Sequence, residues 1–330
     1  MPEALMPWHH RLWEQCLRMR QTDRFHHAFL LRGPEGCGKR AFARRWANVL
    51  VCQEETPAAR PCGRCRGCTL FGAGTHPDVR TIARPPDKKS IGIDRIRGLI
   101  DYVWLSRHMA DRKVVLLPGA EEMTLPAANT LLKTLEEPPG SVVFLLISPA
   151  SHRLPVTIRS RCQRLDFPVP LARDVLPWLT EQLPPGADAA ALLTAAGGAP
   201  LEAMRYWEEN TLQERTKVDG ELTALLTGSM DPLAVAERWK ALGCAAVVPW
   251  SSRYLADLIR LRFTASPRAH SNERADLARR LDPAQGYRLF DRCLAMQRLW
   301  AEAPNLNEAL MLEGLAMDFA AAAGVGETRD

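Results

Sequence analysis

The sequence predicts an α/β domain with a parallel sheet, followed by segments that are entirely helical. Two continuous apolar runs, 114–117 and 142–147, have the pattern of parallel strands that are covered on both faces. A helical segment lies between them, and alternation of strands with helices is typical of doubly wound α/β folds. After residue 166 the strand signals end and amphipathic helical patterns follow. We therefore expect the sheet to be confined to the first half of the chain.

The expected elements of the first half follow one another in a regular order. An apolar strand at 28–32 ends in a glycine-rich turn, and the next segment, 42–50, repeats its apolar side chains at helical spacing. Residues 91–104 predict a second helix, because their isoleucine, leucine and valine residues fall on one face. A third helix is expected around 131–135, and two prolines at 138–139 stop it.

Three parts of the chain are expected. Residues 1–166 form the α/β domain, which carries a cysteine-rich insert at 52–68. Residues 167–207 form a small helical module, and residues 208–330 form an all-α domain. In this last part, five or six amphipathic helices are separated by glycines and prolines. A chain of 330 residues is long enough for such separate cores.

Composition places the chain among ordinary globular proteins. Apolar residues make up 46% and charged residues 25% of the sequence. No run of 18 or more uncharged apolar residues is present and the N-terminus does not have the pattern of a secretory leader, so we expect a cytoplasmic protein. The net charge of +5 is too small for bulk attraction to nucleic acid. Any DNA contact would have to come from a local group of basic residues or from helix N-termini.

A glycine-rich loop at 33–40 follows the first strand and opens the first helix, which is the context of a phosphate-binding loop. Its amides can face an anion, and its lysine can reach the β- and γ-phosphates. The residues that we expect around the phosphates are Gly33, Gly36, Gly38, Lys39 and Arg40. The position after the lysine normally holds Ser or Thr, whose hydroxyl binds Mg²⁺, whereas an arginine cannot coordinate a cation. The loop alone therefore leaves binding of ATP or ADP open.

Four of the nine cysteines gather in the insert, namely Cys52, Cys62, Cys65 and Cys68. Four thiolates suit a closed tetrahedral Zn²⁺ site of the structural kind. Metal binding would also supply the ordering free energy that an insert so rich in proline and glycine lacks. The alternatives are a redox Cys-x-x-Cys and an iron–sulfur cluster, with His76 as an alternative ligand. The other cysteines have no partner by spacing and are expected to be buried, namely Cys16, Cys37, Cys162, Cys244 and Cys293.

Three further motifs carry a family resemblance. They are the histidine pair at 26–27, the block Asn-Thr-Leu-Leu-Lys-Thr-Leu-Glu-Glu-Pro-Pro at 129–139, and Leu-Pro-Val-Thr-Ile-Arg-Ser-Arg-Cys at 154–162. With the phosphate loop and the cysteine cluster, in this order and spacing, the chain closely resembles the clamp-loader subunits of bacterial DNA polymerase III. This AAA+ family includes the gamma/tau ATPases. The C-terminal half matches more loosely, through 305–307 and 310–313.

The resemblance implies a fold and a set of partners. The fold is an AAA+ phosphate-loop module with a small helical lid, followed by a helical collar through which five subunits assemble. The implied partners are the gamma/tau and delta subunits, with the beta sliding clamp and primer–template DNA reached through the assembled complex. The implied function is a part in DNA replication, at forks on the nucleoid, within the DNA polymerase III holoenzyme.

The residues that would hydrolyse ATP are expected to be missing. In active members of the family, the strand before the 129–139 block ends in Asp-Glu, and here those positions hold Pro118 and Gly119. The lid carries Leu201 where the gamma type has a phosphate-sensing arginine. Together with Arg40, these departures predict that the chain has no ATPase activity of its own.

One catalytic group of the family remains, in Ser160-Arg161-Cys162. The resemblance implies that Arg161 is contributed in trans to the ATP site of a neighbouring subunit. A guanidinium stays charged and reaches phosphate oxygens with fixed geometry, so it can neutralise charge that develops during phosphoryl transfer. The alternative is that Arg159, Arg161 and Arg164 form a solvated basic edge.

The sequence also offers candidate residues for contact with DNA and two alternative functions. Arg95 and Arg97 are candidates for primer–template phosphates, although arginines on a surface helix often face only water. A second candidate function is an active gamma-type ATPase that uses acids displaced along the chain, Glu121 or Glu122. A third is a free-standing zinc-dependent nucleic-acid-binding protein, which would bind DNA with a steep salt dependence.

Overall fold

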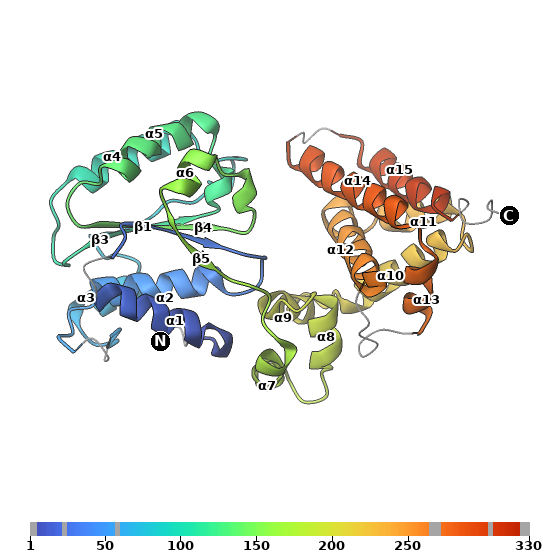
Figure 1. Ribbon diagram of the computed structural model, residues 1–330, viewed down its shortest axis with the longest axis horizontal. Helices are drawn as coiled ribbons and strands as arrows, with labels where there is room; N and C mark the ends of the chain where they lie inside the picture. Colours follow the sequence, from blue (N-terminus) through green and yellow to red (C-terminus); the bar gives the residue numbers. More distant parts are fainter. Residues whose placement is uncertain (1–4, 22–24, 57–59, 264–271, 303–305, 324–330) are drawn as a thin grey trace. The chain divides into compact units, whose positions relative to one another are not determined.

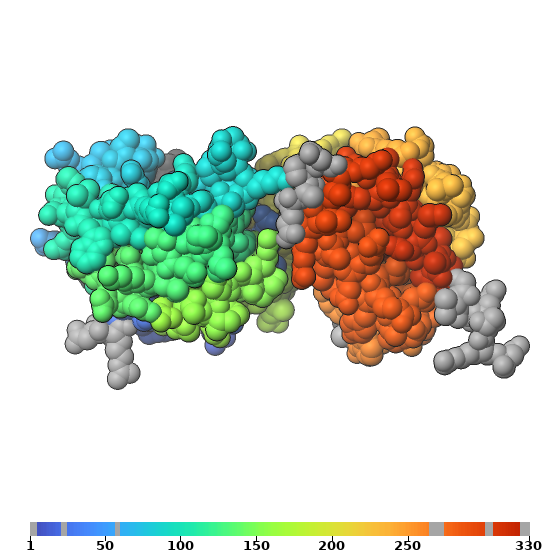
Figure 2. Space-filling view, turned by 90° about the horizontal axis from the view of Figure 1, so that it is seen from above, coloured from blue at the N-terminus to red at the C-terminus, as the bar shows by residue number. Residues whose placement is uncertain are grey.

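The computed structural model describes residues 5–21, 25–56, 60–263, 272–302 and 306–323. The chain divides into two compact units, Met1–Arg205 and Tyr206–Asp330. Figure 1 draws their helices and strands, and Figure 2 draws their surfaces in the same colours along the sequence. Within the described ranges, no helix combines the length and the apolar character that crossing a membrane requires. The division into three parts stays a prediction.

A sheet of five parallel strands forms the centre of the first unit. The strands are β1 (Ala28–Arg32), β2 (Val79–Thr81), β3 (Lys113–Pro118), β4 (Val142–Ser148) and β5 (Gln163–Asp166). Their order is β2-β3-β4-β1-β5. The three central strands are the apolar runs of the sequence and are almost entirely buried. The apolar runs do not predict β2 and β5, because these edge strands are short and half exposed.

Helices cover both faces of the sheet (Figure 1). One layer holds α1 (His10–Gln21), α2 (Lys39–Val51) and α3 (Arg66–Gly72), and the other holds α4 (Ile93–Trp104), α5 (Leu125–Glu136) and α6 (Val156–Ser160). Side chains alternate along β1, so that Leu30 joins the core beside α4 and α5 whereas Phe29 joins the core beside α2. Figure 2 looks onto the layer of α4 to α6, which forms the cyan to green surface of the first unit.

Short elements complete the first unit. The 3₁₀ turns are η1 (Pro7–His9), η3 (Ala120–Glu122) and η4 (Ser151–Arg153), and the helices after the sheet are α7 (Ala172–Gln182), α8 (Ala189–Ala195) and α9 (Pro200–Glu208). Gly198 has φ of +81° in the turn before α9, a conformation that favours glycine. Trp178 of α7 packs edge-to-face on Trp8, with ring centroids 5.1 Å apart. The helical module is therefore held against the N-terminal segment.

Every regular element in the described residues of the second unit is a helix. Its helices are α10 (Leu212–Leu226), α11 (Pro232–Trp239), α12 (Cys244–Phe263), α13 (Asn272–Arg280), α14 (Pro283–Glu302) and α15 (Glu308–Ala321). Trp239, Tyr254 and Phe319 are almost fully buried in its core. Asn307 caps α15, because its side chain accepts a hydrogen bond from the Leu310 amide at 3.2 Å. Asn305, which belongs to the same sequence motif, lies outside the described residues.

A buried carboxylate fixes the loop that leads into β3. Asp78 has no exposed surface, and its two oxygens accept hydrogen bonds at 2.8 Å from the amides of His108, Met109 and Ala110. Burial opposes ionisation of Asp78, but the three amide donors outweigh it and lower the pKa of the carboxyl below its ordinary value. Folding therefore stabilises the ionised form of the Asp78 carboxyl relative to its protonated form.

We expect Asp78→Asn to lower the free energy of unfolding by roughly 3 kcal/mol at pH 7, because an amide nitrogen cannot accept the hydrogen bonds that the second oxygen accepts. Since the pKa of Asp78 is lowered on folding, its contribution is present above the pKa of the unfolded carboxyl and is lost as the pH falls through the folded-state pKa. Urea unfolding from pH 7 down to about pH 2 measures this, because an unfolded Asp carboxyl titrates at about 3.9 and the folded Asp78 at a lower pH. The exposed Asp101→Asn is the control. An unchanged stability would contradict the anchoring role.

Candidate functional site

The glycine-rich loop lies between β1 and the N-terminus of α2. Gly33, Gly36 and Gly38 have φ of +146°, +77° and +87°, and Gly38 caps α2 without any side-chain bond. Side chains at these positions would collide with neighbouring groups; a Cβ on Gly33 would lie 2.0 Å from the Phe167 carbonyl oxygen. The loop borders a cavity of about 230 Å³, which Lys39 also lines. This geometry is that of a phosphate-binding loop at a helix N-terminus.

Several polar groups of this loop form hydrogen bonds with other side chains of the same chain. Lys39 Nζ donates to the Pro34 carbonyl at 2.5 Å, and burial lowers the pKa of Lys39. On the Cys37 carbonyl, the Trp8 indole nitrogen donates at 3.2 Å and His9 Nε2 at 2.8 Å. Burial also lowers the pKa of His9 to about 4, so its ring is neutral at pH 7. The cavity is smaller than the roughly 300–1,000 Å³ of typical small-molecule sites.

The end of β3 holds the two residues for which the family resemblance predicts acids in active members. Pro118 closes the strand, and Gly119 follows with φ of +70°. The carboxylate of Glu122 folds over Gly119, where a Cβ would lie 2.8 Å from one of its oxygens, and it pairs with Arg84 at 3.2 Å. Glu122 is therefore already engaged in a contact away from the phosphate loop.

Glu121 differs from Glu122. It lies in η3 near Lys39, close enough for its charge to favour the protonated lysine. One of its oxygens is buried and has no hydrogen-bond partner among the described residues. Arg40 lines the cavity at the position where Ser or Thr would hold Mg²⁺. Of the two displaced acids, Glu121 is thus the one that faces the loop.

The lid closes the other side of the cavity. The Leu201 amide donates to the Gly36 carbonyl at 2.9 Å, and the Leu201 side chain lines the cavity. Arg205 and Glu202 line it as well and form an ion pair with each other. Sequence comparison with the gamma type singles out Leu201 only. Arg205 lies four residues further along α9, and this helical spacing is the signal that identifies it.

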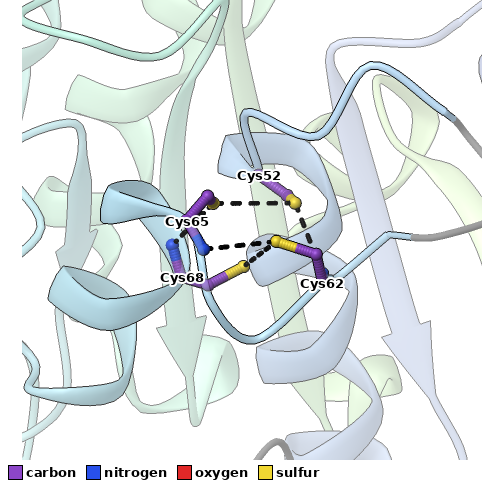
Figure 3. Close-up of side chains that lie close together, drawn as sticks. All are labelled: Cys52, Cys62, Cys65 and Cys68. Atoms are coloured by element: carbon purple, nitrogen blue, oxygen red, sulfur yellow. Dashed lines mark hydrogen bonds between the residues drawn. The ribbon is translucent and has the colours of Figure 1, made fainter.

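The four cysteines of the insert meet at one point (Figure 3). Their sulfur atoms all lie within 4.8 Å of one another, with Cys52–Cys65 at 3.9 Å and Cys62–Cys68 at 4.0 Å. Sulfur atoms bound tetrahedrally at about 2.3 Å from one Zn²⁺ are about 3.8 Å apart, so the cluster fits that metal. No disulfide joins them. The four residues can therefore hold one metal ion.

Backbone amides support the cysteine cluster. The amides of Cys62, Cys65 and Cys68 point to the sulfur atoms of Cys52, Cys62 and Cys65, at 3.5, 3.3 and 3.3 Å. The Arg64 and Cys65 amides lower the pKa of the Cys62 thiol to about 6, whereas burial raises the pKa of the Cys52 and Cys68 thiols. His76 is not among the residues whose ligand atoms meet in the cluster, and its Nδ1 accepts from the Asp78 amide at 3.1 Å. The expectation that the other five cysteines are buried is confirmed.

Arg161 is partly exposed, and two residues close to it in sequence are buried. Ile158 and Cys162 are in the core, and burial raises the pKa of Cys162 to about 12, so it acts as an apolar anchor. Arg161 caps the C-terminus of α6, and one guanidinium nitrogen donates to the Thr157 carbonyl at 2.9 Å. The other terminal nitrogen pairs with the carboxylate of Glu136. Ser160 is exposed and donates to the same Thr157 carbonyl at 3.1 Å.

The two arginines considered for DNA lie two residues apart near the start of α4. Arg95 donates to the Ala83 carbonyl at 2.7 Å, and Arg97 pairs with Asp94 at 3.4 Å. Both side chains are exposed. Among the described residues, Arg95 and Arg97 contact neither the phosphate loop nor the cysteine cluster. Their contact with DNA stays a prediction.

The sheet order, the loop between β1 and α2, and the helical lid against that loop define a phosphate-loop module of the AAA+ class. The family model "DNA polymerase III, delta subunit" matches residues 8–170, and "DNA polymerase III, delta subunit, C terminal" matches 209–320. The chain is similar to the DNA polymerase III subunit delta′ of Pseudomonas aeruginosa, at 35% identity over 98% of this chain and 99% of that protein.

Two further relatives agree with this match. The delta′ subunit of Yersinia pestis is 34% identical over 83% of this chain and 82% of its own length. The DNA polymerase III subunit tau of Bacillus subtilis is 38% identical, over 44% of this chain and 25% of its own length. The chain therefore belongs to the delta-prime (δ′) family of DNA polymerase III subunits, which are components of the clamp loader.

Proposed function

We propose that this chain is a non-catalytic clamp-loader subunit that lends Arg161 to the ATP site of a neighbouring gamma/tau subunit. One contrast carries the proposal. A partly exposed guanidinium is held at the surface by the core residues on either side of it, whereas the chain's own phosphate loop lacks the side chains that hold Mg²⁺ and activate water. Membership of the δ′ family supports the same division of labour.

The chemistry at the neighbouring site needs such a charge. Water attacks the γ-phosphorus, the bond to the bridging oxygen breaks, and negative charge moves to the ADP that leaves and to the phosphoryl oxygens. A guanidinium at those oxygens neutralises the charge without exchanging a proton, because Arg remains protonated in proteins. Arg161 can present further N–H donors beyond those that bind Thr157 and Glu136.

The chain's own loop lacks the equivalent groups. Arg40 cannot replace a hydroxyl ligand of Mg²⁺, and neither Pro118 nor Gly119 offers an oxygen or a base from its side chain. Loss of a general base alone costs roughly 10²- to 10⁴-fold in rate. We propose that the loop is retained for packing, since the lid and the N-terminal segment both bond to its carbonyls.

The purified chain is expected to hydrolyse ATP with Mg²⁺ no faster than its Lys39→Ala variant. The measurement is phosphate release by the isolated chain, under conditions in which the assembled loader is active. One observation favours the second candidate, an active gamma-type ATPase, namely the buried and unpartnered oxygen of Glu121 near Lys39. Turnover by the wild-type chain that Glu121→Gln abolishes would establish that candidate and overturn the first.

The cysteine cluster is proposed to hold one structural Zn²⁺. All four ligands are thiolates, so no position is left open for water or substrate. A bound metal would supply a link between the end of α2, which precedes Cys52, and α3, which contains Cys68. The proposed role is therefore to order the insert, without a part in catalysis.

The second unit is proposed to form the collar that joins this chain to gamma/tau and delta subunits. On α15, Leu310 and Met317 are more than half exposed and lie seven residues apart, on one face of the helix. Gly314 lies between them and would allow close approach of a partner helix. The beta clamp and primer–template DNA would be reached through the complex. Capture of the chain from cells, with subunit composition and metal content measured on the same sample, separates this proposal from a free-standing nucleic-acid-binding protein.

A further inference from the structure

Arg161 is held by a carboxylate from a different helix. Glu136 is the last residue of α5, and its Oε1 accepts from the guanidinium of Arg161, 25 residues further along the chain. The second terminal nitrogen of Arg161 is bonded to the Thr157 carbonyl at 2.9 Å. Two anchors on separate elements therefore fix the direction of the guanidinium. Its remaining N–H donors are available to a partner.

Helix stability does not explain a glutamate at this position. The C-terminus of an α-helix carries partial negative charge, so a carboxylate in its last turn is unfavourable unless a cation compensates it. Glu136 stands in the last turn of α5 and is about half exposed, at 47%. Arg161 pairs with Glu136 and adds a compensating charge to that of Lys133 in the same turn. The next residue, Glu137, is also exposed, but its carboxylate forms no ion pair within the described part of the chain.

We propose that Glu136 is a positioning residue for the arginine finger, an inference that rests on the proposed function of Arg161. An arginine side chain at a surface samples many rotamers, and holding it in one geometry costs conformational entropy. The contacts with Glu136 and Thr157 fix the Arg161 side chain before the subunits assemble, so this conformational entropy is not lost during assembly. Arg161 then meets the neighbouring γ-phosphate in a fixed direction, with its N–H donors that bind neither Glu136 nor Thr157 facing outward.

This role predicts an effect on the rate of chemistry and none on binding. In the reconstituted loader with clamp and primer–template DNA, Glu136→Gln is expected to lower kcat at the site served by Arg161 by about tenfold, because small misplacements of a catalytic group have large effects on rate. The KM for ATP and the assembly of the complex are expected to stay unchanged. Glu136→Asp keeps the charge on a shorter side chain and is expected to recover part of the loss.

Two comparisons make the test specific. Glu137→Gln removes an adjacent exposed carboxylate that does not contact Arg161, and it is expected to leave kcat unchanged. In an Arg161→Ala background, Glu136→Gln is expected to have no further effect, because the group that it positions is absent. A purely structural role for Glu136 would instead lower turnover equally in both backgrounds, and would overturn the inference.

The outcomes also separate this inference from the proposed function. If Arg161→Ala lowers turnover but Glu136→Gln leaves kcat unchanged or raises it, Glu136 does not position the finger and only this inference fails. If Arg161→Ala itself has no effect on turnover, the proposed function fails, and the positioning role fails with it. Gel filtration and thermal unfolding of each variant show whether it folds and assembles.

Discussion

Replacing Arg161 with alanine is expected to slow ATP hydrolysis at the one site that it serves by about 10³- to 10⁵-fold, the range known for arginine fingers. The reason is electrostatic, because charge that develops on the transferring phosphoryl group loses its counter-charge in a site from which water is excluded. The measurement is clamp-dependent ATP turnover of the reconstituted complex, with assembly checked by sedimentation. Assembly should persist, because Cys162 and Ile158, rather than Arg161, anchor α6 in the core.

Arg164 offers a matched control for this variant. It is an exposed arginine on β5, three residues from Arg161. Arg164→Ala removes the same charge from the same edge of the domain, so it tests the alternative of a solvated basic edge directly. Equal losses of ATP turnover in both variants would favour the solvated basic edge. Unchanged turnover with Arg161→Ala would contradict the role of Arg161 as an arginine finger.

Replacing Cys65 with serine is expected to abolish zinc binding and to unfold the insert. Structural Zn²⁺ in small domains contributes roughly 10–16 kcal/mol of apparent binding free energy, and most of this is lost with one ligand. We expect the zinc content of the purified chain to fall from about one to near zero per chain. The midpoint of thermal unfolding should fall as well, and limited proteolysis should cut the insert between α2 and α3.

Arg66→Ala serves as the control for the zinc prediction, since Arg66 is an exposed residue next to Cys65 that offers no metal ligand. It should keep one zinc per chain and the wild-type unfolding midpoint. A wild-type chain purified without any zinc, iron or other bound metal, yet with an ordered insert, would contradict the structural role of the metal. Iron in place of zinc would favour the iron–sulfur alternative.

The predictability of the fold follows from where each element lies in the sheet. The central strands β1, β3 and β4 are buried on both faces, so their sequences are continuous apolar runs and could be predicted within one residue of each end. The edge strands β2 and β5 are partly exposed and hold polar residues, so their pairing depends on neighbours that no local pattern reveals. The apolar spacing of Trp13 and Cys16 would have predicted α1.

The candidate site could be predicted in its residues but not in its contacts. The spacing of glycines and cysteines identifies a phosphate loop and a metal cluster, because the backbone requirements of both are local. The contacts of Trp8 and His9 with the Cys37 carbonyl span 29 and 28 residues, and no sequence pattern joins them. The same holds for Glu136 and Arg161, which meet only because α5 and α6 pack on one face of the sheet.

The most direct measurement is the structure of the assembled loader on clamp and primed DNA with a non-hydrolysable ATP analogue. The account predicts the Arg161 guanidinium at about 3 Å from γ-phosphate oxygens bound by a neighbouring subunit. It also predicts that no Mg²⁺ is held beside Arg40 in this chain's own loop. The account would be contradicted by an Arg161 that faces away from every subunit interface, or by Mg·ATP in this chain's pocket with Glu121 directed at an attacking water.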